Sequence, residues 1–211
     1  MGKKLFLLLL LISQGANLFS QEPWKLSKNT DGIEVYTIKH TSDFKTFKGH
    51  ISLNESIHSF VAMLNDVEGF LNWGYKLKQV SLLERSGDTL QIYHAIAEVP
   101  FPYKDREGVY LNKMKWQPET NTLFVAIEIL DDYMSPNKKY TRVTGKGFWE
   151  VKVLTSGKLD ITFQMQINPG GSIPAWLVNL FIDDTPFYTL QNIQKAIKNE
   201  KYHQKTFDFI K

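Results

Sequence analysis

Residues 168–179 read Asn-Pro-Gly-Gly-Ser-Ile-Pro-Ala-Trp-Leu-Val-Asn and mark the point where the chain changes from strands to helices. The glycine pair permits a sharp turn, because glycine adopts backbone angles that other residues avoid. Pro174 then suits the first turn of a helix, where its missing amide hydrogen is no loss. Bulky apolar residues follow at helical spacing: Ile173, Trp176, Leu177, Leu180 and Phe181. Core packing is the default explanation of this stripe.

A second apolar stripe continues toward the C-terminus. It consists of Phe187, Leu190, Ile193 and Ile197. Pro186 lies between the two stripes, and a proline inside a helix removes a hydrogen bond and kinks the axis. The pattern predicts one long C-terminal helix, bent near residues 184–186.

Upstream of this region, alternating apolar residues and turn signals predict strands. The predicted strands are residues 33–38, 44–53, 78–84, 90–99, 109–116, 123–129, 147–153 and 159–167. Helical spacing appears at 57–64, with Asn54 or Ser56 as the cap, and a short helical piece is expected at 67–73. Consecutive hairpins of this kind indicate one antiparallel, strongly curved sheet.

The first 20 residues carry the pattern of a signal peptide. Lys3 and Lys4 precede an apolar run from Leu5 to Ile12, which is too short to span a bilayer. The alternative is a cytosolic N-terminal helix, although no amphipathic period runs through the segment. We expect cleavage near Ser20, export to the periplasm or the medium, and one domain over residues 21–211.

Composition excludes several classes of function. The chain of 211 residues has no cysteine, so disulfides, thiolate metal sites and cysteine nucleophiles are ruled out. Its 25 Lys and Arg face 22 Asp and Glu, and loss of Lys3 and Lys4 would leave a net charge of about +1. Nucleic-acid binding would need a clustered basic face, which this balance does not indicate.

Sequence motifs of catalysis and metal binding are also lacking. The five histidines form no HxH or HExxH pair, and a lone histidine is more often structural than a ligand. Residues 170–172 do not have the G-x-S-x-G frame of a nucleophile elbow. We therefore predict no catalytic residue, no metal site and no cofactor.

Residues 98–107 read Glu-Val-Pro-Phe-Pro-Tyr-Lys-Asp-Arg-Glu and allow two interpretations. The first is a stiff surface loop that protects a sheet edge. The second is a gate over a cavity, with Phe101 and Tyr103 facing a lipid and the helical stripe at 176–181 closing the cavity from the other side.

The two segments together resemble the START family, the lipid-transfer domains related to steroidogenic acute regulatory protein. The resemblance rests on residues 100–102, 168–171 and 173–179, and on Arg106-Glu107 where the family has an Arg-Asp pair. Weaker matches in the same order extend it over nearly the whole chain beyond residue 20: Trp24, Val35, Tyr36, Lys45, Lys48, Trp73, Arg142 and Trp149.

This resemblance implies an α+β helix-grip fold, with a curved antiparallel sheet wrapped around a long C-terminal helix and an internal apolar cavity. It implies that the chain binds a lipid or another apolar small molecule, with transfer as a further step and transient contact with a membrane surface. We expect a monomer. One departure is Asn112, which stands where many relatives have a second Arg, and this weakens the case for a charged headgroup such as phosphate.

The predicted ligand-binding residues combine the loop, the helical stripe and inward-facing strand positions. Polar candidates are Glu98, Arg106 and Asn112, with the hydroxyls of Tyr93, Tyr110 and Tyr133. Apolar or gating candidates are Trp73, Phe101, Tyr103, Phe163, Trp176, Leu177, Leu180 and Phe181.

Two other classes of function stay open. One is a helix-grip enzyme, a cyclase or hydrolase, which would need a convergent acid–base pair in the same cavity. The other is an interaction module whose cavity is filled by side chains. A small molecule that co-purifies with the protein would separate binding from the second of these.

Overall fold

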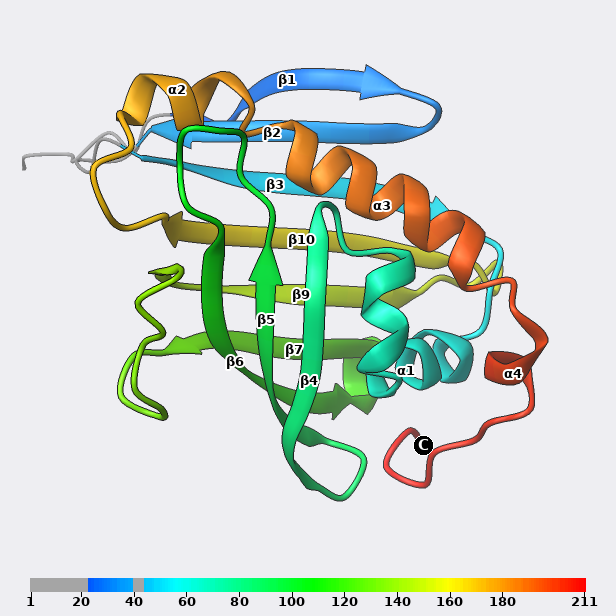
Figure 1. Ribbon diagram of the computed structural model, residues 1–211. Helices are drawn as coiled ribbons and strands as arrows, with labels where there is room; N and C mark the ends of the chain where they lie inside the picture. Colours follow the sequence, from blue (N-terminus) through cyan, green and yellow to red (C-terminus); the bar gives the residue numbers. More distant parts are fainter. Residues whose placement is uncertain (1–22, 40–43) are drawn as a thin grey trace, which may run out of the picture.

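The computed structural model describes residues 23–39 and 44–211, shown in Figure 1. The signal-peptide prediction falls on residues 1–20, outside this part of the chain. The first half contains β1 (Lys25–Thr30), β2 (Ile33–Lys39), β3 (Lys45–Leu53), α1 (Ile57–Asn65), η1 (Glu68–Asn72), β4 (Leu77–Ser86) and β5 (Leu90–Ala97). The second half contains β6 (Arg106–Gln117), η2 (Pro118–Thr120), β7 (Thr122–Leu130), β8 (Thr141–Arg142), β9 (Thr144–Val153), β10 (Leu159–Asn168), α2 (Ala175–Leu180), α3 (Asp184–Ala196) and α4 (Glu200–His203).

One large sheet runs through the described residues in the order β1-β2-β3-β10-β9-β7-β6-β5-β4, with the short β8 pairing parallel to β6. Every other pairing is antiparallel. In Figure 1, β4, β5 and β6 cross in front of β7, β9 and β10, so the sheet bends back over itself. The predicted curved antiparallel sheet is confirmed.

The concave face of the sheet is apolar because the strands alternate. On β10, Leu159, Ile161, Phe163 and Met165 are buried while the residues between them are partly exposed. Helix α3 lies against β2 and β3 and contributes Phe187, Leu190, Ile193 to the same core. Gly49 of β3 makes this close approach possible, since a Cβ there would come within 2.8 Å of Leu190 Cδ1.

The two predicted short helices are present. Ser56 caps α1, and its hydroxyl accepts a hydrogen bond from the Ser59 amide at 2.9 Å. The expected helical piece at 67–73 forms a 3-10 helix, η1, over Glu68–Asn72. These two elements close one end of the curved sheet (Figure 1).

The C-terminal region differs from the single bent helix that we expected. The chain leaves helical geometry at residues 181–183, so α2 and α3 are separate helices. Pro186 lies in the first turn of α3. Backbone nitrogens in the first turn make no hydrogen bond within the helix, so the proline removes none and causes no kink. The second apolar stripe keeps the helical spacing of the first, since Leu180 and Phe187 are seven residues apart, and this is why the sequence predicted one bent helix.

Two strands were not predicted. β1 is polar and largely exposed on both faces, so it has no apolar alternation to recognise. β8 has only two residues and exists through its pairing with Arg106 and Glu107 of β6. The strands that were predicted are all present, with ends that differ by a few residues.

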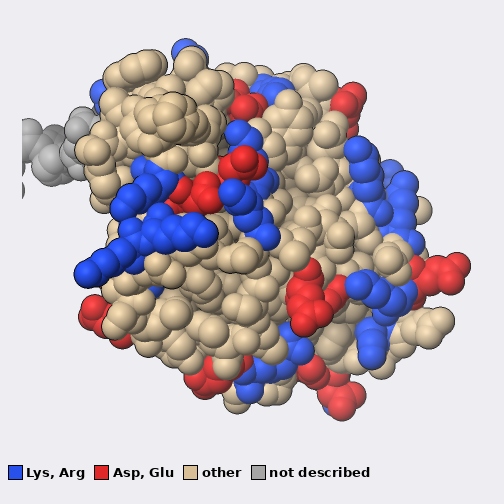
Figure 2. All heavy atoms as spheres, in the orientation of Figure 1, with Lys and Arg blue, Asp and Glu red and all other residues tan. Residues whose placement is uncertain are grey.

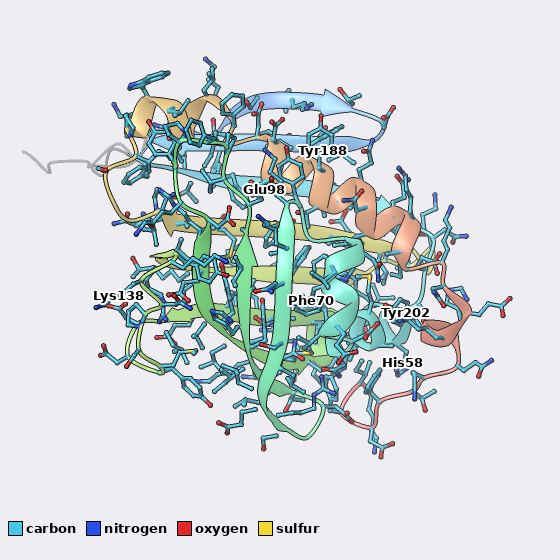
Figure 3. The ribbon with its side chains drawn as sticks, viewed as in Figure 1. His58, Phe70, Glu98, Lys138, Tyr188 and Tyr202 are labelled. Carbon is cyan, nitrogen blue, oxygen red and sulfur yellow. The ribbon has the colours of Figure 1, made fainter. Side chains whose placement is uncertain are left out.

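The C-terminal segment docks on α1. The Tyr202 hydroxyl donates to Asp66 Oδ2 at 2.7 Å, and Lys201 Nζ lies 2.6 Å from the same oxygen. Further on, the Phe207 amide donates to His58 Nδ1 at 3.2 Å. Figure 3 shows Tyr202 and His58 at this end of the molecule. Within residues 23–39 and 44–211, no helix has the length and apolar character needed to cross a membrane.

Candidate functional site

A row of six aromatic side chains crosses the concave interior, and we call it the aromatic row. It consists of Phe163, Trp149, Trp73, Phe70, Tyr93 and Tyr110. Successive ring centroids are 4.0, 6.3, 4.6, 5.1 and 5.2 Å apart. Rings this close touch one another, so the row is a continuous apolar surface inside the fold.

Strand register and η1 together build the row. Trp149 and Phe163 are direct partners on β9 and β10, and their rings stack. Tyr93 and Tyr110 are direct partners on β5 and β6, on the other arm of the bent sheet. Residues 68–73 enter between these arms, and Figure 3 shows Phe70 behind β4. The bend of the sheet thus brings distant strands to one interior surface.

Two buried polar atoms beside the aromatic row lack a hydrogen-bond partner among the described residues. They are Nε1 of Trp73, a residue 6% exposed, and Oδ1 of Asn112, a residue 2% exposed. The amide of Asn112 is also hydrogen-bonded to the Tyr93 hydroxyl. A buried donor or acceptor without a partner is uncommon in a native fold and calls for an explanation.

The two tyrosines of the row are held in the neutral form. Burial raises the pKa of Tyr93 well above its usual range, and the neighbouring Tyr110 adds to the rise. Burial also raises the pKa of Tyr110 to about 12. Both hydroxyls therefore stay protonated near neutral pH and offer uncharged hydrogen-bonding groups.

Arg106 joins two segments that are far apart in sequence. Its guanidinium donates to the carbonyl oxygens of Pro169 at 3.0 Å and Gly170 at 3.3 Å, and also to that of Lys104. Burial lowers the pKa of Arg106, although nearby Asp105 opposes this effect. The β5–β6 loop and the turn between β10 and α2 are therefore both hydrogen-bonded to the Arg106 guanidinium.

The end of the molecule beyond Arg106 exposes a group of large apolar side chains, which we call the mouth patch. It consists of Phe101, Trp176, Leu180 and Phe181. Phe101 is 96% exposed and Trp176 is 69% exposed. Figure 1 shows the β5–β6 loop reaching up to α2. In Figure 2 the uncharged surface over α2 is bordered by Lys and Arg side chains.

The convex side of the sheet carries a separate polar cluster. Glu107 is buried there and accepts from the Asn137 amide at 2.7 Å, with Arg142 Nη2 at 3.4 Å and His94 Nε2 at 3.1 Å. These contacts hold the loop between β7 and β8 against the sheet. The cluster is structural, since each oxygen of Glu107 already has a partner.

The comparison with known proteins identifies the family. No family model matches the chain. The chain is 31% identical to the STAR-related lipid transfer protein of Xanthomonas axonopodis. The two structures match over 83% of this chain and 99% of the other, with a TM-score of 0.77. The chain belongs to the STAR-related lipid transfer (START) family.

Two curated relatives span a similar length. An uncharacterised protein of Pseudomonas aeruginosa is 29% identical over 177 residues, or 83% of this chain and 87% of the relative. The phosphatidylcholine transfer protein of the rat is 25% identical over 191 residues, or 87% of this chain and 86% of the relative. The family and the helix-grip fold inferred from the sequence are thus confirmed.

Five of the predicted site residues lie in or beside the aromatic row in the interior of the domain: Trp73, Tyr93, Tyr110, Asn112 and Phe163. The remaining ones lie elsewhere.

Glu98 is exposed at the end of β5, and Figure 3 shows it beside the upper end of β4. The Tyr133 hydroxyl donates to Glu84 Oε2 at 3.1 Å on the surface of the domain. Tyr103 is partly buried in the β5–β6 loop, and Arg106 bonds backbone carbonyls at its base.

The predicted role of α2 needs correction. We expected Trp176, Leu177, Leu180 and Phe181 to pack inward, as core residues that close the interior. Leu177 is partly buried, but the other three are more than half exposed. Only one side of the short helix α2 packs against the domain. The side that carries Trp176 and Leu180 faces away from it.

Sequence reasoning did not place Trp149 or Phe70 among the site residues. Trp149 lies between Gly147 and Val151 in the period-two pattern of β9, and this pattern marks the inward face. Phe70 lies in η1 and Trp73 directly follows its last residue, and a spacing of three residues places both on one side of that 3-10 turn. Both signals were present in the sequence.

The described residues contain no group of three or more His, Cys, Asp or Glu side chains that could hold a metal ion. Two open hollows lie on the surface. One has a volume of about 340 Å³ and lies at the ends of β9 and β10, next to Phe44. The other, of about 410 Å³, is lined by residues 128–133. Neither hollow reaches the aromatic row.

Proposed function

We propose that this START domain holds one lipid or other apolar small molecule against the aromatic row and performs no covalent chemistry on it. The observation that carries the proposal is the row itself, an apolar surface that runs across both arms of the sheet. The relatives named above include two lipid transfer proteins, which supports the same ligand class.

The chemistry of the buried side chains favours binding over catalysis. Among the described residues, the buried charged side chains include Arg106, Glu107 and Arg142, and each is engaged by partners that hold it in place. A general acid or base must reach its substrate with a pKa near the working pH. The raised pKa values of Tyr93 and Tyr110 take their hydroxyls away from that range.

Entry of a ligand requires the interior to open. The rings of the aromatic row are already in contact, so a lipid has to move some of them apart. The side chains of the mouth patch are largely exposed, and segments with few buried side chains open at a low free-energy cost. We therefore propose that the ligand passes between the Phe101 loop and α2.

The same end is proposed to touch a membrane during exchange. Burial of apolar surface gains about 25 cal/mol per Å², so the exposed rings of Phe101 and Trp176 favour insertion into a lipid layer. Positive charge near the mouth patch would favour an anionic membrane surface. Lys104 and Lys138 lie close together there, since Lys104 Nζ donates to the Lys138 carbonyl at 2.8 Å. Contact with the membrane is transient in this proposal, and the protein acts as a monomer.

The proposal is tested by native mass spectrometry of the purified protein, followed by transfer of a fluorescent phospholipid between vesicles. A co-purifying small molecule at one per chain and a transfer rate above the spontaneous rate are expected. A clean apo mass, together with no uptake of phospholipid, fatty acid or sterol analogues, would overturn the proposal. Turnover of a bound lipid would instead support the enzyme alternative.

We also propose that the domain works after export, on the basis of the apolar run in residues 5–12, outside the described part of the chain. N-terminal sequencing of the protein from its native host is expected to begin at or near residue 21. Recovery of the intact N-terminus from a cytosolic fraction would refute export and leave the binding proposal untouched.

A further inference from the structure

The polar end of the ligand can be deduced from the two unpaired atoms in the interior. Trp73 Nε1 can only donate a hydrogen bond, and Asn112 Oδ1 can only accept one. Both residues are more than nine-tenths buried, so bulk water does not serve as their partner. A protein that retains an unpaired donor and an unpaired acceptor in its core usually has a use for them.

Both residues contact members of the aromatic row. The Trp73 ring packs against Phe70 and Trp149, two members of the aromatic row. Asn112 bonds to Tyr93, a third member, and is two residues along β6 from Tyr110, which places both on the concave face. A molecule that lies along the row therefore meets the indole from η1 and the amide from β6.

The charges around this interior disfavour an ionic group. Among the described residues, the charged side chains that are buried include Arg106, Glu107 and Arg142. The Arg106 guanidinium is occupied by three backbone carbonyls, and Glu107 is held on the convex side by Asn137 and Arg142. A carboxylate or phosphate in the interior would thus lose its water without gaining a counter-charge.

On the basis of the proposed function, we propose that the ligand is an uncharged lipid whose polar end is a hydroxyl group, held by Trp73 and Asn112. The hydroxyl oxygen accepts from the indole Nε1–H, and the hydroxyl hydrogen is donated to Oδ1 of the amide. A hydroxyl is both donor and acceptor, so it also fits the amide if its oxygen and nitrogen are exchanged. Long-chain alcohols and sterols have this chemistry.

The experiment compares four probes that each carry a monounsaturated chain of 18 carbons: oleyl alcohol, oleate, 1-oleoyl-lysophosphatidylcholine and the hydrocarbon 1-octadecene. Dissociation constants are measured at pH 8, where oleate is ionised, with a constant trace of detergent below its micelle concentration. Oleyl alcohol is expected to bind about tenfold more tightly than each of the others, as two hydrogen bonds of ordinary strength would give.

Two variants test the residues. Trp73→Phe removes the indole N–H and Asn112→Leu removes the amide. Each is expected to reduce the preference for oleyl alcohol over 1-octadecene, the ratio of the two dissociation constants, by about 3- to 10-fold. Trp116→Phe is the matched control, because the Trp116 Nε1 already donates to the Lys211 carbonyl at 2.7 Å near the chain end. Its affinity for oleyl alcohol should equal that of the wild type.

The outcomes separate this inference from the proposed function. If 1-octadecene binds but oleyl alcohol binds no better, or if both folded variants keep the wild-type preference, the hydroxyl proposal is overturned and lipid binding stands. Tighter binding of lysophosphatidylcholine would also overturn it and would place a choline group on the aromatic row. Failure of all four probes to bind would overturn both proposals. Thermal melting checks folding, and Asn112→Leu decides alone if Trp73→Phe does not fold.

Discussion

Replacing Phe101 with alanine is expected to weaken membrane exchange without weakening the fold. The side chain is 96% exposed, so its removal takes almost no buried surface from the folded state. We expect the free energy of unfolding to change by less than about 0.5 kcal/mol. Full burial of a phenylalanine side chain in an apolar layer gains about 1.5–3 kcal/mol. Because each 1.4 kcal/mol is tenfold, vesicle binding should fall by about 10- to 100-fold.

The assay measures three quantities for each variant: the melting temperature, binding to sedimented phosphatidylcholine–phosphatidylglycerol vesicles, and the rate of lipid transfer between vesicles. Trp176→Ala should behave like Phe101→Ala, since this residue is 69% exposed. Leu83→Ala on β4 is the matched surface control, because Leu83 is also an exposed apolar side chain but lies outside the mouth patch. It should leave all three quantities unchanged.

A buried phenylalanine sets the scale for loss of stability. Phe60 has no exposed surface, and its replacement by alanine should cost about 3–5 kcal/mol, on the order of 10 °C in melting temperature. The reasoning is refuted if Phe101→Ala lowers the melting temperature as far as Phe60→Ala does and leaves vesicle binding and transfer at the wild-type level. The loop would then be part of the packed structure and not part of the mouth.

Two further predictions concern the fold around the site. Gly170→Ala should lower stability by about 1–2 kcal/mol or more, because Gly170 has a φ of +64° and a Cβ would lie 2.5 Å from the Arg142 carbonyl oxygen. Gly87→Ala, at φ +56° with open space around it, should cost less in the same melting experiment, and an equal cost would contradict the steric argument. Asp66 is pulled in two directions: burial alone would raise its pKa, but hydrogen bonds from α4 outweigh this and lower it. Its stabilising effect is therefore complete above the unfolded pKa of about 3.9 and is lost as the pH falls through the lower folded value. Asp66→Asn should destabilise the protein more at pH 7 than at pH 2.5, and a difference in melting temperature that does not depend on pH would refute this assignment.

The sheet was predictable from the sequence because the burial of one face imposes a period of two. β10 shows this most clearly, since Leu159, Ile161, Phe163 and Met165 alternate with more polar residues along the whole strand. The glycine turns between the strands supplied the remaining information. β1 escaped prediction for the same physical reason, because a strand exposed on both faces has no alternation to read.

The helical region was less predictable. Helical spacing tells which residues share a side, but it does not tell what covers that side. Trp176 and Phe187 belong to stripes of the same kind, and yet the first faces solvent while the second is buried. The two helices are separated by the turn at residues 181–183, where the Ser27 hydroxyl of β1 donates to Asp183 Oδ2 at 2.9 Å. Helical spacing alone does not reveal such a contact with a strand more than 150 residues away.

The candidate site was predicted in part. Asn112 and Tyr93 were recognised as inward-facing polar residues on strands, and strand register is a local property. Arg106 was expected to bind a ligand as a polar side chain that points inward from a strand. Its actual partners are main-chain carbonyls up to 64 residues away. Every residue has a backbone carbonyl, so the sequence does not indicate which of them a side chain will bond.

The position of the Arg106 guanidinium limits how the domain can open. The loop that carries Phe101 and the turn that leads into α2 are pinned to the same planar group, which keeps its positive charge at any physiological pH. If one side swings away while the cation stays bonded to the other, the opening behaves as a lever about a fixed pivot. The β5–β6 loop and α2 then cannot move independently when they contact a membrane. The width of the opening is limited by how far the backbone can bend before a hydrogen bond from Arg106 to a carbonyl breaks.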